Sequence, residues 1–204
     1  MSDRAIEARL RALRGPAEAE WERVRAELGA RAAGEGLVDV AVETHDSPLG
    51  TLLLGATGEG LVRVALPAEA HDEVLDDLAW RVGPRVLRAP RAAVADARRQ
   101  LDEYFAGRRQ VFELPLDWRL SRGFRREALR AIAAIPYGST ASYREIAARA
   151  GSPGAVRAAG TACATNPLPI VVPCHRVLRA DGGVGGYLGG AEMKSRLLAL
   201  ERAG

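Results

Sequence analysis

The spacing of apolar residues changes near residue 35, from a helical period to a period of two. Before that point the chain is rich in Ala, Arg and Glu, and its larger apolar residues recur three or four positions apart on both sides of a break at Gly15-Pro16. They are Ile6, Leu10 and Leu13, then Trp21, Val24 and Leu28. This pattern predicts two helices in residues 1–34. They could form a hairpin packed on the rest of the chain or a partly ordered extension, and the apolar side chains favour packing.

From residue 38 onward, apolar and polar residues alternate, which is typical of half-buried strands. Valines at alternate positions from Val38 to Val42 predict the first strand. Clusters of turn-forming residues then mark two boundaries. They lie at 46–50 and 58–60 and leave further strands at 51–56 and 61–66. Short strands joined by such tight turns predict an antiparallel meander.

Two helices are predicted after the strands, at about 70–82 and 90–106. The second has one apolar face, formed by Val94, Ala97, Leu101, Tyr104 and Phe105. Residues 107–120 carry no clear period and are predicted to connect two domains. The predicted parts of the chain are therefore an N-terminal extension (1–34), an α/β domain (35–106), this connector (107–120) and a second domain (121–204).

The second domain contains a helix-turn-helix pattern. Ser121 is a candidate N-cap for a helix in which Phe124, Ala128, Ile132 and Ile135 recur at helical spacing. Two short helices at 143–150 and 155–164 then flank a turn at 151–154. The second short helix consists largely of Ala and Gly, so it has a thin face from which Arg157 projects. Small-residue helix pairs also occur in proteins that never contact DNA, so this pattern alone leaves DNA binding open.

The positive charge is concentrated in the second half of the chain. Residues 119–204 hold 13 Lys and Arg against 5 Asp and Glu, a net of +8, whereas residues 1–118 hold 16 against 21, a net of −5. One basic half is expected when that half faces a polyanion. The chain shows neither a signal-peptide pattern nor an apolar run of membrane-spanning length, so a cytoplasmic protein without a membrane partner is expected.

One of the two cysteines lies in a segment suited to chemistry. Residues 166–177 read Asn-Pro-Leu-Pro-Ile-Val-Val-Pro-Cys-His-Arg-Val, which places Cys174 between Pro173 and His175. The apolar run at 170–172 predicts a short buried strand, and prolines on both sides should fix the backbone. A thiol attacks as thiolate, and an imidazole that takes its proton, directly or through one water, produces thiolate near neutral pH. The alternative is a small buried cysteine beside a surface histidine, while Cys163, in a run of small residues, is expected to belong to the core.

The segment Pro-Cys-His-Arg-Val at 173–177 resembles the active-site motif of the O6-alkylguanine-DNA alkyltransferases, also called methylated-DNA–protein-cysteine methyltransferases. The similarity runs from about residue 38 to residue 201 and is densest from Ile135 onward. It implies an α+β fold: an N-terminal ribonuclease H-like domain with a short antiparallel sheet and helices, then a C-terminal winged-helix-like helix-turn-helix domain that carries the cysteine. The resemblance implies no cofactor and no metal, and His45 and His71 stand alone in the sequence.

The resemblance also implies a reaction and its catalytic residues. An alkyl group on O6 of guanine, with O4 of thymine as an implied second substrate, would pass to Cys174 in one irreversible step. Glu201 matches the family's glutamate that hydrogen-bonds the motif histidine, giving a relay from Cys174 through water and His175 to Glu201. A surface role is the alternative for Glu201.

Further matches imply how DNA would be held. Arg157 resembles the arginine that fills the gap left by the flipped nucleotide when the helix enters the minor groove, and Tyr143 resembles the tyrosine beside the target phosphate. Arg176 is expected to contribute positive charge to DNA binding. Asn166 resembles the asparagine that ties the recognition helix to the active-site loop. The simpler readings are a surface arginine, a core tyrosine and an ordinary Asx turn.

The glycine-rich stretch 181–190 is expected to border the guanine. It lacks the Lys-Ser/Thr ending of a phosphate-binding loop. Tyr187 resembles the tyrosine that donates to the departing oxygen, and Val184, Gly185 and Gly189 should allow a flat base to approach closely. Leu188 stands where relatives carry a hydroxyl residue, which affects tolerance of bulky alkyl groups.

Two other classes of function remain open from the residues alone. A cysteine hydrolase would turn over and would need an oxyanion hole. A DNA-binding regulator would need no reactive cysteine. The alkyltransferase reading predicts a monomer that binds double-stranded DNA carrying alkylated guanine and reacts once.

Overall fold

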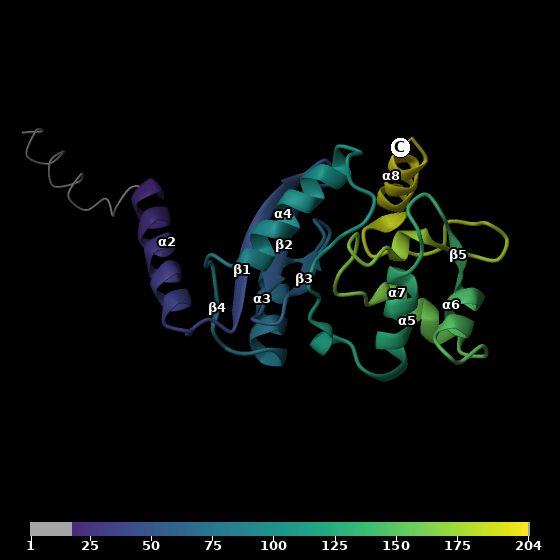
Figure 1. Ribbon diagram of the computed structural model, residues 1–204, viewed down its shortest axis with the longest axis horizontal. Coiled ribbons are helices and arrows are strands. Elements are labelled where there is room, and N and C mark those ends of the chain that lie inside the picture. Colours follow the sequence, from purple (N-terminus) through teal and green to yellow (C-terminus); the bar gives the residue numbers. More distant parts are fainter. Residues whose placement is uncertain (1–17, 204) are drawn as a thin grey trace, which may run out of the picture.

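The structure is a computed structural model that describes residues 18–203. It has two lobes with a separate helix on the N-terminal side (Figure 1). The N-terminal lobe is a small sheet with helices, and the C-terminal lobe is mainly helical. In this part of the chain, no helix is long and apolar enough to cross a membrane.

The sheet contains the predicted antiparallel meander. Strands β1 (Val40–Ser47), β2 (Gly50–Ala56) and β3 (Leu61–Ala65) pair in that order. Ser47 pairs with Gly50, so the first turn is a two-residue loop. The sequence pattern misses a fourth strand, β4 (Val86–Leu87), which pairs parallel to β1 and gives the order β3-β2-β1-β4. Two residues are too short a run for a periodic signal.

Neighbouring residues of a strand point to opposite faces of the sheet, and a helix packs on the apolar side chains of each face. Helix α3 (His71–Arg81) packs with Leu53 on one face. Helix α4 (Ala92–Phe105) packs with Leu52 and Leu54 on the other, through the predicted apolar face. This second core continues into the C-terminal lobe without interruption, so the two lobes share it.

Helix α2 (Glu18–Gly34) packs differently from the prediction. Trp21, Val24 and Leu28 were expected to face the protein, but they are 45%, 46% and 61% exposed. The contact is made instead by Gly29 and Ala32, and a side chain at Gly29 would collide with the backbone of Arg88. Small residues allow backbones to approach closely, and this decides which face packs. The helix predicted before Gly15-Pro16 lies outside the described residues.

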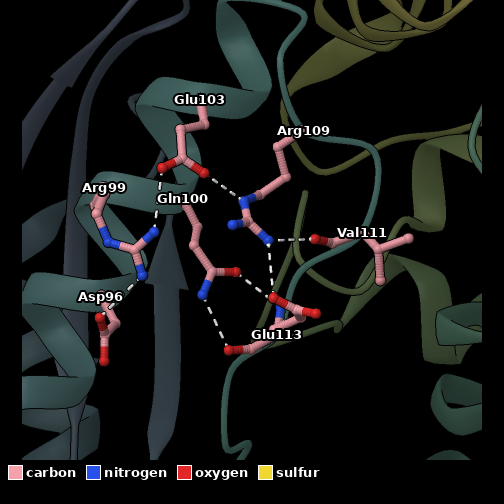
Figure 2. A network of polar contacts seen from close by, with 7 residues as sticks. All are labelled: Asp96, Arg99, Gln100, Glu103, Arg109, Val111 and Glu113. Carbon is pink, nitrogen blue, oxygen red and sulfur yellow. Dashed lines mark hydrogen bonds and ion pairs between the residues drawn. The ribbon is translucent and has the colours of Figure 1, made fainter.

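The connector is pinned to α4 by polar contacts (Figure 2). The side chain of Gln100 donates to the carbonyl oxygen of Glu113 at 2.9 Å and accepts from its N–H at 2.7 Å. Arg109 donates to Glu103 at 2.6 Å. Next the chain runs beside β3, where the N–H of Leu61 donates to the carbonyl of Pro115. These contacts hold the connector against α4 and β3 of the N-terminal lobe.

The C-terminal lobe begins with a short 3-10 turn, η1 (Trp118–Leu120), and helix α5 (Gly123–Ala133). Ser121 is not the N-cap of α5: it is buried at the end of η1, and Arg122 occupies the N-cap position. Strand β5 (Ala141–Ser142) pairs parallel with β6 (Val177–Leu178). Helices α6 (Tyr143–Arg149) and α7 (Val156–Ala164) form the predicted helix-turn-helix, and α8 (Gly190–Ala203) ends the lobe.

Candidate active site

The loop before the cysteine is a compact turn rather than the predicted strand at 170–172. Ile170 has a φ of 73°, a left-handed conformation that β-branched residues rarely adopt, and the N–H of Val172 donates to the carbonyl of Leu168 at 2.8 Å. Proline cannot donate to a strand ladder, and prolines flank this run on both sides. The loop is docked on the N-terminal lobe instead, because the carbonyl of Pro167 accepts from the N–H of Val64.

Pro173, the last residue of this loop, orients the backbone at Cys174. Pro173 has φ −80° and ψ 64°, and the N–H of Cys174 donates to the carbonyl of Val172 at 2.8 Å. These values describe an inverse γ-turn. It leads directly into the 3-10 turn η2 (Cys174–Arg176), so a sharp bend separates the buried loop from the Cys-His-Arg residues.

Asn166 connects the end of α7 to this loop and to the thiol. It is buried, its Oδ1 accepts from the N–H of Leu168 at 3.0 Å, and its Nδ2 donates to the carbonyl of Val172 at 2.8 Å. The same Nδ2 lies 3.2 Å from Sγ of Cys174. Helix end, loop and thiol therefore meet at one amide.

The Cys174 thiol is protonated near neutral pH. Burial raises its pKa to about 11, although the Asn166 hydrogen bond and the charge of Lys194 oppose the rise. The sequence suggested thiolate near neutral pH, and burial is the reason for the difference. The proton must therefore be removed when a substrate is present. Burial raises the pKa of Cys163 further, to about 12.

Glu201 is buried at the centre of a hydrogen-bond network and is not a surface residue. Its Oε1 accepts from Tyr104 Oη at 2.7 Å, from His175 Nε2 at 2.7 Å and from Arg176 at 2.9 Å. Its Oε2 accepts from Arg176 Nε at 2.9 Å and from the N–H of Gly138 at 3.3 Å. Burial would raise the pKa of Glu201, but the hydrogen bonds from His175 and Arg176 outweigh burial and hold it at about 2. The carboxylate is thus ionised at every physiological pH.

This ionised carboxylate sets the proton positions on His175. A carboxylate can only accept, so His175 Nε2 must carry a proton and Nδ1 is left with the lone pair. Burial lowers the pKa of His175, which Glu201 opposes, so the ring is neutral near pH 7. Nδ1 is buried and has no hydrogen-bond partner among the described residues. Chemically, His175 is a neutral base with one free acceptor atom.

The structure does not support the predicted DNA contact of Arg176. Its guanidinium is buried, makes two bonds to Glu201 and donates to the carbonyl of Ile135 at 2.5 Å. With these donors engaged inside the protein, Arg176 serves as a counter-charge for Glu201.

Tyr187, predicted for the substrate pocket, and Tyr143, predicted for DNA binding, both lie close to the cysteine loop. The Tyr187 ring packs edge-on against His175 with 6.4 Å between centroids, and its hydroxyl is buried without a partner in the described part of the chain. Tyr143 is the first residue of α6, and its hydroxyl would lie 3.0 Å from a Cβ atom at Gly185, which has a φ of 66°. A side chain at Gly189 would strike the sulfur of Met193. Val184 is half-buried in the same glycine-rich loop.

Helix α7 presents the predicted thin face. Arg157, Ala158 and Thr161 are exposed, whereas Ala159, Ala162 and Cys163 are buried against the lobe. Within the described residues, Arg157 takes part in a hydrogen bond only through its carbonyl, which accepts from Thr161 at 3.2 Å, and its exposed guanidinium has no ion pair there.

Two family domains match this chain. Residues 40–118 match the ribonuclease-like domain of 6-O-methylguanine DNA methyltransferase, and residues 123–203 match its DNA binding domain. The methylated-DNA–protein-cysteine methyltransferase of Mycolicibacterium paratuberculosis is 43% identical over 163 residues, covering 80% of this chain and 93% of the relative. The chain belongs to the 6-O-methylguanine DNA methyltransferase family.

Other members of the methyltransferase family agree in sequence and structure. The constitutive methylated-DNA–protein-cysteine methyltransferase of Bacillus subtilis is 39% identical, covering 78% of this chain and 93% of the relative. The crystal structure of Mycobacterium tuberculosis OGT in complex with DNA is 38% identical, with a TM-score of 0.67 and coverage of 80% and 93%. The predicted family, the α+β fold and the prediction of a DNA-binding repair methyltransferase are confirmed.

Two residues at the methyltransferase site escape sequence reasoning. Tyr104, predicted only as part of the apolar face of α4, donates to Glu201 from the other lobe. Lys194 is fully buried and donates to the carbonyl of Val177 at 2.5 Å. A signal for Lys194 does exist: it shares a helical stripe with Leu197, Leu198 and Glu201, all of them buried. Tyr104 has no such local signal. No cluster of His, Cys, Asp or Glu side chains suited to a metal ion was found among the residues described.

Proposed function

We propose that this chain transfers a methyl or other alkyl group from O6 of guanine in double-stranded DNA to Sγ of its own Cys174, once per molecule. The observation that carries the proposal is the neutral, buried His175, whose Nε2–H is held by Glu201 and whose Nδ1 is free. A neutral imidazole with a free Nδ1 can accept the proton that the Cys174 thiol loses when it attacks the substrate.

In the proposed step, Nδ1 of His175 accepts the proton of Cys174 through one water. Sγ attacks the alkyl carbon, an S–C bond forms, and the C–O bond breaks with its electron pair going to guanine. The imidazolium that forms lies against the ionised Glu201, so the negative charge is in place before the reaction begins. The thioether product is not cleaved, which limits the protein to one turnover.

The proposed pocket places Tyr187 over the departing oxygen. Its buried hydroxyl has no partner among the described residues, and such a group is a donor ready for a substrate atom. Val184, Gly185 and Gly189 would form a thin wall against the flat base. Leu188 adds apolar surface without a hydroxyl, so the backbone and Tyr187 supply the polar contacts.

The target atom lies inside the base stack, so the nucleotide must be turned out of the duplex. We assign entry into the minor groove to the thin face of α7, with Arg157 filling the gap and Tyr143 beside the target phosphate. Asn166 would keep α7 and the thiol in a fixed relation. One copy of the chain contains every residue of this scheme, so we propose a monomer, and the free thiol suits a reducing cytoplasm.

Peptide mass spectrometry after incubation with duplex DNA containing O6-methylguanine tests the proposal. The peptide that contains Cys174 should gain one methyl group, and Cys174→Ser should gain none while still binding DNA. Methyl on Cys163 would refute the assignment of the nucleophile, and repeated turnover would refute the single-use reaction.

A further inference from the structure

Four arginines surround one hollow at the junction of the two lobes. The hollow has a volume of about 470 Å³ and is lined by Arg81, Arg119, Leu120, Arg122 and Arg125. We call it the arginine pocket. Arg81 ends α3 and Arg119 lies in η1, whereas Arg122 and Arg125 belong to the start of α5. The pocket is therefore built by elements from both lobes.

Only part of this positive charge is neutralised. Arg81 pairs with Asp77 at 2.9 Å and Arg119 pairs with Asp117 at 2.6 Å. Arg125 contacts only uncharged acceptors, and Arg122 is exposed without an ion pair in the described part of the chain. Within residues 18–203, two of the four charges thus have no carboxylate partner.

The guanidinium groups are also held close to one another. Arg81 and Arg125 both donate to the carbonyl oxygen of Leu120. Burial lowers the pKa of Arg125, and the like charge of the neighbouring Arg81 lowers it further. A bound anion would remove the repulsion, and a planar guanidinium matches the oxygens of a phosphate.

The pocket lies next to the helix-turn-helix. Arg125 is 3.4 Å from the hydroxyl of Thr165, which caps the end of α7. A strand of DNA that contacts α7 therefore passes near a site already lined with positive charge.

We propose that the arginine pocket binds a phosphate group of the DNA backbone, outside the contact made by α7. This proposal rests on the proposed function, because it assumes that DNA meets α7. The N-terminal lobe then takes a direct part in DNA binding, through Arg81 of α3.

The test is the salt dependence of binding to an unmodified duplex by the full chain and by Arg122→Gln. Each phosphate contact that is lost should reduce the slope of log K against log salt by about 0.9. We expect that reduction, together with about three- to tenfold weaker binding at low salt, whereas Arg122→Lys should keep the slope. Arg122 is exposed and unpaired, so the substitution should leave the fold intact. The matched control is Arg31→Gln, which removes the same charge from the surface of α2.

Further measurements distinguish a DNA phosphate from a free anion as the ligand of the pocket. They also distinguish failure of this proposal from failure of the proposed function. Calorimetry tests inorganic phosphate as the ligand, and binding that depends on Arg122 supports the proposal only when the DNA slope is also reduced in Arg122→Gln. Phosphate binding lost in Arg122→Gln, with an unchanged DNA slope, would assign the pocket to a free anion and overturn the proposal. An unchanged salt slope for DNA binding, together with no phosphate binding, would show that the arginines are only a structural cluster, and it would also overturn the proposal. Reaction with free O6-benzylguanine should be unaffected by Arg122→Gln, whereas no alkyl uptake by wild type would reject the proposed function instead.

Discussion

Replacing Glu201 by Gln tests whether the buried carboxylate activates the thiol. The pKa of Glu201 is lowered from 4.5 to about 2, so the folded protein favours the ionised form by roughly 3 kcal/mol, at about 1.4 kcal/mol per unit. The amide of Gln can still accept from His175, but it carries no charge to stabilise the imidazolium. Loss of one charge-assisted hydrogen bond is worth about 1.5–3 kcal/mol, and alkyl transfer should slow about ten- to a hundredfold.

The pH dependence should change as well. In the proposed mechanism, His175 and Glu201 allow the wild-type thiol to lose its proton near neutral pH. In Glu201→Gln the reaction depends on thiolate formed by loss of the proton to solvent, and burial places the pKa of Cys174 at about 11. The single-turnover rate of the variant should therefore keep rising by about tenfold per pH unit well above pH 8. Stopped reactions with O6-benzylguanine between pH 6 and 10 measure both effects.

A control for folding is needed, because the Gln variant leaves Arg176 buried without its counter-charge. Breaking such a pair costs about 3–5 kcal/mol, whereas removing both members is much less costly. The double variant Glu201→Gln/Arg176→Met should be more stable than the single one and equally slow. Glu192→Gln, on the exposed side of the same helix, is the matched control. A folded Glu201→Gln protein with wild-type rate and pH profile would refute the relay.

Three further perturbations test other parts of the site. Arg157→Ala should slow repair of a duplex far more than reaction with free O6-benzylguanine, since only the duplex requires base flipping; equal losses would contradict this role. Tyr104→Phe should slow both substrates by about two- to tenfold, the value of one hydrogen bond, while Tyr137→Phe, whose hydroxyl donates to the carbonyl of Leu200 rather than to Glu201, should not. In acid titrations followed by circular dichroism, the lowered pKa of Glu201 means that its contribution to stability is full above pH 4.5 and is lost as the pH falls from about 4.5 to about 2.

Local patterns in the sequence identify most elements and the residues that act within one segment. The alternation after residue 38 predicts the meander, and the resemblance at 173–177 leads to Cys174 and His175. The same reasoning fails where distant segments decide the outcome. The run at 170–172 has strand composition, but the loop is held by Asn166 and by Val64 of the other lobe.

Charge in a sequence likewise does not reveal its partner. Arg176 sits in a basic half of the chain, yet its partner is Glu201, 25 residues away and buried. Tyr104 is separated from Glu201 by 97 residues, and only the packing of α4 against the C-terminal lobe brings them together. For α2, the helical spacing is correct, but the sizes of Gly29 and Ala32 select the packed face.

The placement of the tryptophans has an optical consequence. Of the three in the chain, Trp21 is 45% and Trp80 90% exposed. Trp118 is half-buried and packs against the shared core, where the chain passes from one lobe to the other, with Arg130 over its ring at 6.0 Å. Replacing Trp21 and Trp80 by Phe would leave one intrinsic fluorophore at the junction. Its emission would then report, without an added label, whether the lobes shift relative to each other when DNA binds.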